Sequence, residues 1–111
     1  MPHREWRIRI EDILNAIERT KRHINGLSED QFSKDEKTID AVIHTFAIIG
    51  EAASCVPREI QKKHPTIPWL EMTDMRNFII HEYFGVSTRV LWKTIHDDLP
   101  MAVPLLKELL K

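Results

Sequence analysis

The chain has 111 residues and nearly balanced charge, with 16 lysines and arginines against 17 aspartates and glutamates and a formal net charge of −1. A chain of this length buries enough surface for one hydrophobic core but not for two, so we expect a single domain over residues 1–111. The balanced charge excludes binding to nucleic acid or an anionic membrane through overall positive charge, and any RNA contact must be local.

The start of the chain and its cysteine content bear on where the protein works. The first twelve residues are too rich in charge for the apolar core of a signal peptide, and no apolar run reaches the ~20 residues that span a bilayer. Cys55 is the only cysteine, which excludes an intramolecular disulfide. Its small apolar neighbours predict a buried filler. We expect a cytoplasmic protein that does not enter a membrane.

Helical periodicity dominates the sequence from its start. Apolar residues at spacings of three and four predict a first helix that ends at Gly26, after the basic residues 21–23 of its last turn. Ser28 and Gln31 have the spacing of a capping box, which predicts a short helical turn ending near Ser33.

The middle of the chain carries a second long apolar stripe, from Ile39 to Val56. It predicts a helix of about six turns, and Gly50 within it would allow a neighbouring helix to approach closely. Pro57 marks the end of this helix or the start of a short basic segment that runs to His64.

The last third of the chain predicts two more helices. Trp69 follows a proline-framed turn and opens a helix that Gly85 ends, and Ser87 can cap the next one, whose apolar stripe is Val90, Leu91, Thr94 and Ile95. Pro100 and Pro104 predict that its continuation is kinked or broken. No alternating strand pattern is present. The fold class is therefore all-α, an antiparallel bundle of four principal helices with short additional ones.

Residues 76–85, RNFIIHEYFG, concentrate the groups that suit phosphate chemistry. Arg76 can neutralise a phosphate through a two-point contact, and His81 can move a proton near neutral pH. Asn77 and Tyr83 can hold or orient a substrate. We therefore take these four as the candidate site residues.

Helical geometry divides these groups into two rows. At roughly 100° per residue, Asn77 and His81 lie about 40° apart and Arg76 and Tyr83 about 20° apart, whereas Arg76 and His81 are separated by roughly 140°. One straight helix does not aim Arg76 and His81 at one point easily. The reach of arginine, fraying near Gly85 or a second copy of the helix could close the gap.

The order and spacing of Arg76, Asn77, His81 and Tyr83 resemble the signature of the HEPN ribonucleases, and most closely that of HepT-like toxins of toxin-antitoxin pairs. The resemblance implies a HEPN-type helical bundle. It covers nearly the whole chain, in the order and spacing of the family, through DAVIHTFAIIGEAASCVP (40–57), IPWLEMTDMRN (67–77) and HEYFGVSTRVLWKTIHDDLP (81–100).

The resemblance implies a metal-independent endoribonuclease that acts as a toxin on RNA and needs no cofactor. Arg76 and His81 would be catalytic, with Asn77 and Tyr83 binding the substrate. Members of the family pair as homodimers whose motif helices share one cleft, and such pairing would close the angular gap. HepT-like toxins also have a cognate minimal nucleotidyltransferase antitoxin, which transfers AMP to the motif tyrosine, here Tyr83. The added phosphate and bulk would then block RNA.

Structural roles compete with these functional ones. Glu51 is either half of a surface or interhelical ion pair or a group that orients Arg76. His81 could be a satisfied histidine in the last turn of a helix, and the hydroxyl of Tyr83 could lie at the rim of the bundle. The residues expected to do nothing but pack in the core are Trp69, Met72, Met75, Ile79 and Ile80.

Two further functions stay open, and three classes of site are poorly supported. The chain could be a non-catalytic helical binding module that partners a nucleotidyltransferase, or a regulatory domain that binds a nucleotide through Arg76. The histidines lack the spacing of zinc ligands, no nucleophile elbow surrounds a serine, and three glycines form no phosphate loop.

Overall fold

The structure is a computed structural model that describes residues 2–81 and 87–111, with side chains placed for 6–76 and 87–111. This part of the chain is helical and contains no strand, as the sequence predicts. In chain order, the segments are α1 (Pro2–Ile24), α2 (Glu29–Ser33), α3 (Glu36–Ser54), α4 (Arg58–Lys63), α5 (Trp69–His81), α6 (Thr88–Lys93), the π-helical turn η1 (Thr94–Asp98) and α7 (Leu99–Leu109).

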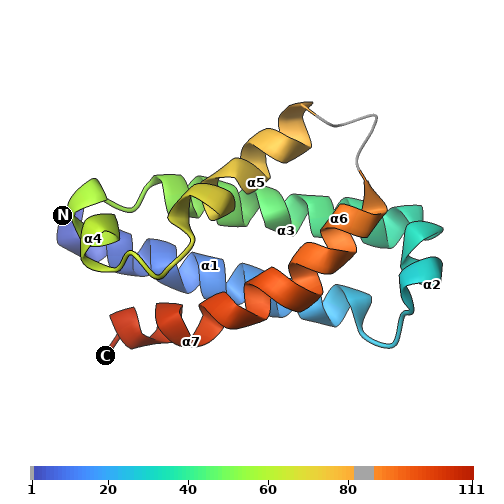
Figure 1. Ribbon diagram of the computed structural model, residues 1–111, viewed down its shortest axis with the longest axis horizontal. Coiled ribbons are helices and arrows are strands. Elements are labelled where there is room, and N and C mark those ends of the chain that lie inside the picture. The colour runs from blue at the N-terminus through green and yellow to red at the C-terminus, as the bar shows by residue number, and fades with distance from the viewer. Residues whose placement is uncertain (1, 82–86) are drawn as a thin grey trace.

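Four long elements form the bundle (Figure 1). The helices α1 and α3 lie side by side, and α5 packs on α3. The segments α6, η1 and α7 make one continuous helical run, which packs against α1 through α7. None of the described helices is long and apolar enough to cross a membrane.

The predicted apolar stripes form the core. Ile10 and Ile13 of α1 and Val42 and Ile49 of α3 are fully buried, and Phe46 between them is 2% exposed. Among the residues of α5 predicted to pack in the core, Trp69, Met72 and Met75 are buried, whereas the side chains of Ile79 and Ile80 lie outside the described residues.

The predicted helix ends that fall on described residues are confirmed, whereas the end expected at Gly85 lies outside them. Gly26 follows α1 with φ +82°, a conformation that favours glycine. The capping box of Ser28 and Gln31 starts α2, and the Ser87 hydroxyl accepts the backbone N–H of Val90 at the start of α6. At the start of α3, hydrogen bonds from the Thr38 hydroxyl and backbone N–H hold the pKa of the Asp35 carboxyl below its usual value.

Three expectations need correction. Cys55 is exposed and not a buried filler, because it follows the exposed Glu51 by four residues and lies on the same side of the helix, whereas its neighbours Ala53 and Val56 are buried. Val90 is 47% exposed and does not belong to the buried stripe, which Leu91 and Ile95 form instead. Of the kink or break expected at Pro100 and Pro104, the break is wrong, since α7 stays helical through both. Pro100 lies in its first turn, where a missing N–H is tolerated, and Pro104 lies inside it.

Candidate functional site

The backbone of Arg76 lies against Gly50, so that α5 and α3 touch at this point. A Cβ atom at position 50 would lie 2.6 Å from both the Cβ and the backbone N of Arg76. Real Cβ atoms do not approach other atoms so closely, and only glycine allows this contact. The prediction that Gly50 admits a close helix neighbour is confirmed, and the neighbour is the candidate catalytic arginine itself.

The next residue of α3 anchors the guanidinium of Arg76. Nη1 of Arg76 donates to Oε2 of Glu51 at 2.5 Å, and the two side chains are 39% and 53% exposed. An ion pair this accessible contributes little to stability. Its consequence is geometric, because it ties one end of the guanidinium to α3.

The Nε atom of Arg76 is buried and has no acceptor among the described residues. A buried donor left without a partner costs about 1–3 kcal/mol. Arg76 therefore has its backbone fixed by Gly50, one end of its guanidinium held by Glu51, and about two-fifths of its side chain open to solvent.

The other predicted site residues are placed only in part. The backbone of α5 stays helical through His81, so Asn77 and His81 lie one turn apart on the helix that carries Arg76. The side chains of Asn77 and His81, and all of Tyr83, lie outside the described residues. The interhelical ion pair expected for Glu51 is present, with Arg76 as its partner.

A hollow beside Glu51 was not predicted from the sequence. It has a volume of about 330 Å³, lies between α1 and α3, and is lined by Arg9, His44 and Glu51 among others. Arg9 and His44 thus share a hollow with Glu51, the partner of Arg76, and Asp12 adds a second carboxylate to its lining. Only the approach of α1 to α3 brings them together, which is a contact between distant segments that periodicity does not specify.

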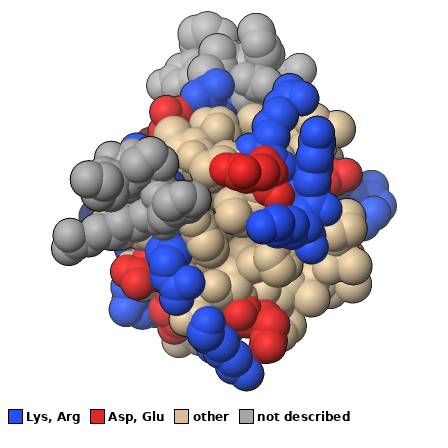
Figure 2. Space-filling view, turned by 90° about the vertical axis from the view of Figure 1, so that its left-hand side faces the viewer, with Lys and Arg blue, Asp and Glu red and all other residues tan. Residues whose placement is uncertain are grey.

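Charge at the end of the molecule that carries α4 is mixed. Figure 2 shows lysine and arginine side chains there interspersed with acidic ones over a broad uncharged area. The short basic segment between Pro57 and His64 lies in this region, and its Arg58, Lys62 and Lys63 are exposed. The described residues on this face form no uniformly basic surface, as expected for charged side chains that are simply solvated.

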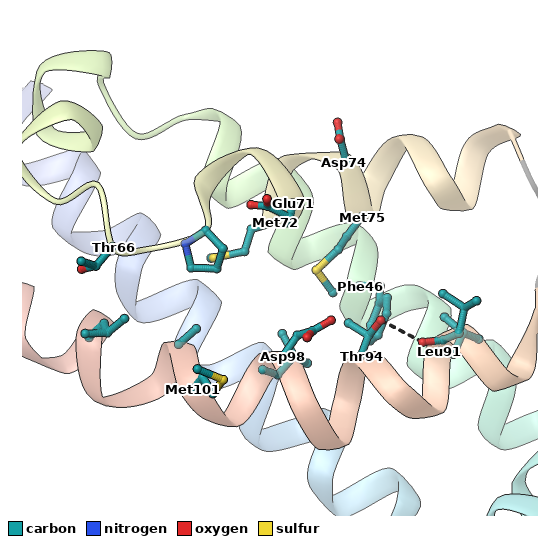
Figure 3. A pocket seen from close by; sticks show the side chains of 15 residues that line it. Phe46, Thr66, Glu71, Met72, Asp74, Met75, Leu91, Thr94, Asp98 and Met101 are labelled. Carbon is teal, nitrogen blue, oxygen red and sulfur yellow. Dashed lines mark hydrogen bonds between the residues drawn. The ribbon is translucent and has the colours of Figure 1, made fainter.

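A larger groove lies on the other side of α5, between α5 and the run from α6 to α7 (Figure 3). Its volume is about 570 Å³, and its lining is mostly apolar. Arg76, the motif residue whose side chain the structure describes, is not among its lining residues. The described residues contain no cluster of three or more histidine, cysteine, aspartate or glutamate side chains able to hold a metal ion.

Comparisons with known proteins identify similar sequences. A family model described as "Ribonuclease HepT-like" matches residues 13–109. A protein of Thermococcus cleftensis named "Probable ribonuclease HepT" is 46% identical over 91 residues, which are 82% of this chain and 83% of that protein. A protein of Caldanaerobacter subterraneus subsp. tengcongensis named "Putative RNase" is 38% identical over 92% of this chain and 91% of its own length. No solved structure gives a significant match.

Proposed function

Because the chain belongs to the ribonuclease HepT-like family, we propose that it is an endoribonuclease that cleaves RNA without a metal ion. The observation that carries the proposal is the held but solvent-accessible guanidinium of Arg76 on the helix that also carries His81. A group fixed in this way can meet the charge that develops on a phosphate without reorganising first.

In the proposed reaction, the RNA supplies its own nucleophile. The 2′-hydroxyl oxygen attacks the adjacent phosphorus, the bond from phosphorus to the 5′-oxygen breaks, and a 2′,3′-cyclic phosphate and a 5′-hydroxyl result. His81 takes the proton of the 2′-hydroxyl or gives one to the leaving 5′-oxygen. Arg76 stabilises the extra negative charge on the pentacoordinate phosphorus, and Asn77 positions the phosphate.

The proposed reaction predicts that cleavage requires the 2′-hydroxyl of the nucleotide at the cleavage site. An RNA oligonucleotide with a single cleavage site should lose cleavage there when that nucleotide is 2′-deoxy, because the nucleophile is gone. Mass spectrometry of the products should show cyclic or 3′-phosphate ends, and a chelator should leave the rate unchanged.

Cleavage of the 2′-deoxy site, or loss of activity with the chelator, would contradict this mechanism. Binding of intact RNA without any cleavage would favour a non-catalytic module. Binding of ATP but not RNA in a calorimetric titration would favour a domain that senses a nucleotide.

The active species is a homodimer in this proposal. Arg76 and His81 are five residues apart on α5, and about 140° separates them around the helix axis. A two-fold axis near the two motif helices would bring the arginine of one copy toward the histidine of the other, because an isologous contact repeats the same surface twice. The RNA would then lie in a cleft shared by two protomers.

The proposed biological role is that of a toxin silenced by a nucleotidyltransferase antitoxin. Transfer of AMP to the phenol of Tyr83 would add a phosphate and a nucleoside two residues after His81. The added negative charge would compete with RNA for Arg76, and the added bulk would fill the cleft.

Co-expression with the cognate nucleotidyltransferase should therefore raise the intact mass of the protein by one or more AMP units and reduce RNA cleavage. Tyr83→Phe should keep the unmodified mass, because it lacks the accepting oxygen. An unmodified mass in the neutralised wild-type protein, or AMP on another residue, would refute this assignment and favour inhibition by tight binding.

A further inference from the structure

The groove between α5 and the run from α6 to α7 has an apolar floor and an exposed apolar rim (Figure 3). Met72 and Leu91 are buried at its floor, and Met75 is 8% exposed. On the rim, Val90 is 47% and Met101 is 74% exposed. The groove therefore offers apolar surface to a partner on its floor and on its rim, and neither Arg76 nor Glu51 is among its lining residues.

The composition of the lining favours an apolar partner of adaptable shape. Met72, Met75 and Met101 are three of the four methionines in the whole chain, and all three line this groove. Methionine is flexible and polarisable, so it adjusts to the side chains of a partner, and it is enriched at surfaces that bind amphipathic helices.

The charged residues that line the groove are all acidic. Glu71, Asp74 and Asp98 are among its fifteen lining residues, and none of the fifteen is lysine or arginine. Figure 3 shows Glu71 and Asp74 along α5 and Asp98 between the two walls. Carboxylates on both sides of an apolar floor repel a nucleic acid and attract a cationic partner.

The length of the groove fits a helix of about four turns. One wall is formed in succession by Val90, Thr94, Asp98, Met101 and Leu105, which follow each other at spacings of three or four along the run. The fifteen steps along the chain from Val90 to Leu105 correspond to roughly 22 Å of helix. A partner helix of similar length would contact the whole floor.

We propose that this groove docks a basic amphipathic helix of a partner protein. The apolar face of that helix, with side chains at i, i+3 or i+4 and i+7, would cover the methionines. Its flanking lysines or arginines would pair with the carboxylates on the two walls. The inference does not depend on the RNA reaction, because it uses none of the residues assigned to that reaction.

A synthetic peptide tests the proposal with the full chain. The probe is a fluorescent 15-residue peptide of leucine and lysine, patterned as an amphipathic helix, and its reference is the same composition scrambled so that no apolar face forms. Fluorescence anisotropy should show binding of the patterned peptide at least about tenfold tighter than that of the scrambled one. Equal binding of the two peptides would overturn the proposal.

Two matched pairs of variants test whether the patterned peptide binds in the groove. Met101→Glu should weaken binding of the patterned peptide by at least about tenfold, because it puts a charge at the apolar contact. Leu70→Glu is the control, since Leu70 is also highly exposed, at 69%, but does not line the groove. Asp98→Lys should weaken binding more than Asp97→Lys, because Asp97 is exposed and outside the lining.

Equal effects within either pair would place the peptide elsewhere and overturn the inference. Sedimentation of the wild type and of Met101→Glu, without peptide, provides the remaining test. A dimer that dissociates only in Met101→Glu would mean that a second copy of the chain covers the groove, and the proposed partner would be wrong. An unchanged oligomeric state together with weakened peptide binding would support it.

Discussion

His81→Ala should lower the rate of RNA cleavage by about 10²- to 10⁴-fold, the usual contribution of general acid-base catalysis. The rate should be measured in single turnover with excess protein, so that substrate binding and product release do not mask the chemical step. Thermal unfolding of the variant should match that of the wild type, because the predicted role of His81 is chemical. His96→Ala serves as the control, since His96 is an exposed histidine of η1 that takes no part in the proposed reaction. A wild-type rate in His81→Ala would remove His81 from the mechanism.

Arg76→Ala should be comparably inactive, and mixing the two inactive proteins tests how the site is assembled. If the arginine and histidine of one site come from different protomers, a dimer with one Arg76→Ala chain and one His81→Ala chain contains one intact site of two. Half of randomly formed dimers are of this kind, so an equal mixture should recover about a quarter of the wild-type rate. No recovery, in a mixture shown to exchange subunits, would mean that each protomer uses its own pair.

Local sequence rules predicted the helices and their ends. The φ of +82° at Gly26, the capping box of Ser28 and Gln31 and the cap at Ser87 depend on contacts within a few residues, which spacing alone specifies. The long apolar stripes were equally predictable, because a helix of 3.6 residues per turn places them on one face. The fold class follows from these local features.

Contacts between distant segments were harder to predict. The sequence suggested that Gly50 meets a close neighbour and that Glu51 forms an ion pair or orients Arg76, but it could not show that both residues meet the same arginine. Cys55 has the small apolar neighbours of a buried position, yet it lies four residues after Glu51, on the exposed side of the helix. The exposure of Val90 follows from the groove, which exists only because α5 and the run from α6 to α7 diverge around it.

Gly50→Ala should lower the free energy of unfolding, although alanine stabilises an ordinary helix position by roughly 0.5–1 kcal/mol relative to glycine. The new Cβ would lie 2.6 Å from the Cβ and backbone N of Arg76 and 3.0 Å from its Cα. These atoms are the backbone of α5 and the Cβ fixed to it, so no side-chain rotation can move them. The two helices α3 and α5 must therefore separate. Overpacking of this kind typically costs about 1–3 kcal/mol, which denaturation by urea resolves. Ser54→Ala, at an exposed position of the same helix, is the control for helix propensity.

Cleavage should fall together with stability in Gly50→Ala, because separating the helices moves Arg76 away from Glu51. The double variant Gly50→Ala, Arg76→Ala separates a backbone clash from a side-chain clash. Alanine at position 76 keeps the Cβ, the N and the Cα, so the second substitution should recover none of the lost stability. Recovery of stability in the double variant would show that the long arginine side chain causes the clash. Unchanged stability in Gly50→Ala alone would show that an alanine Cβ fits between the two helices, and that they do not meet as closely as the 2.6 Å distance to Arg76 implies.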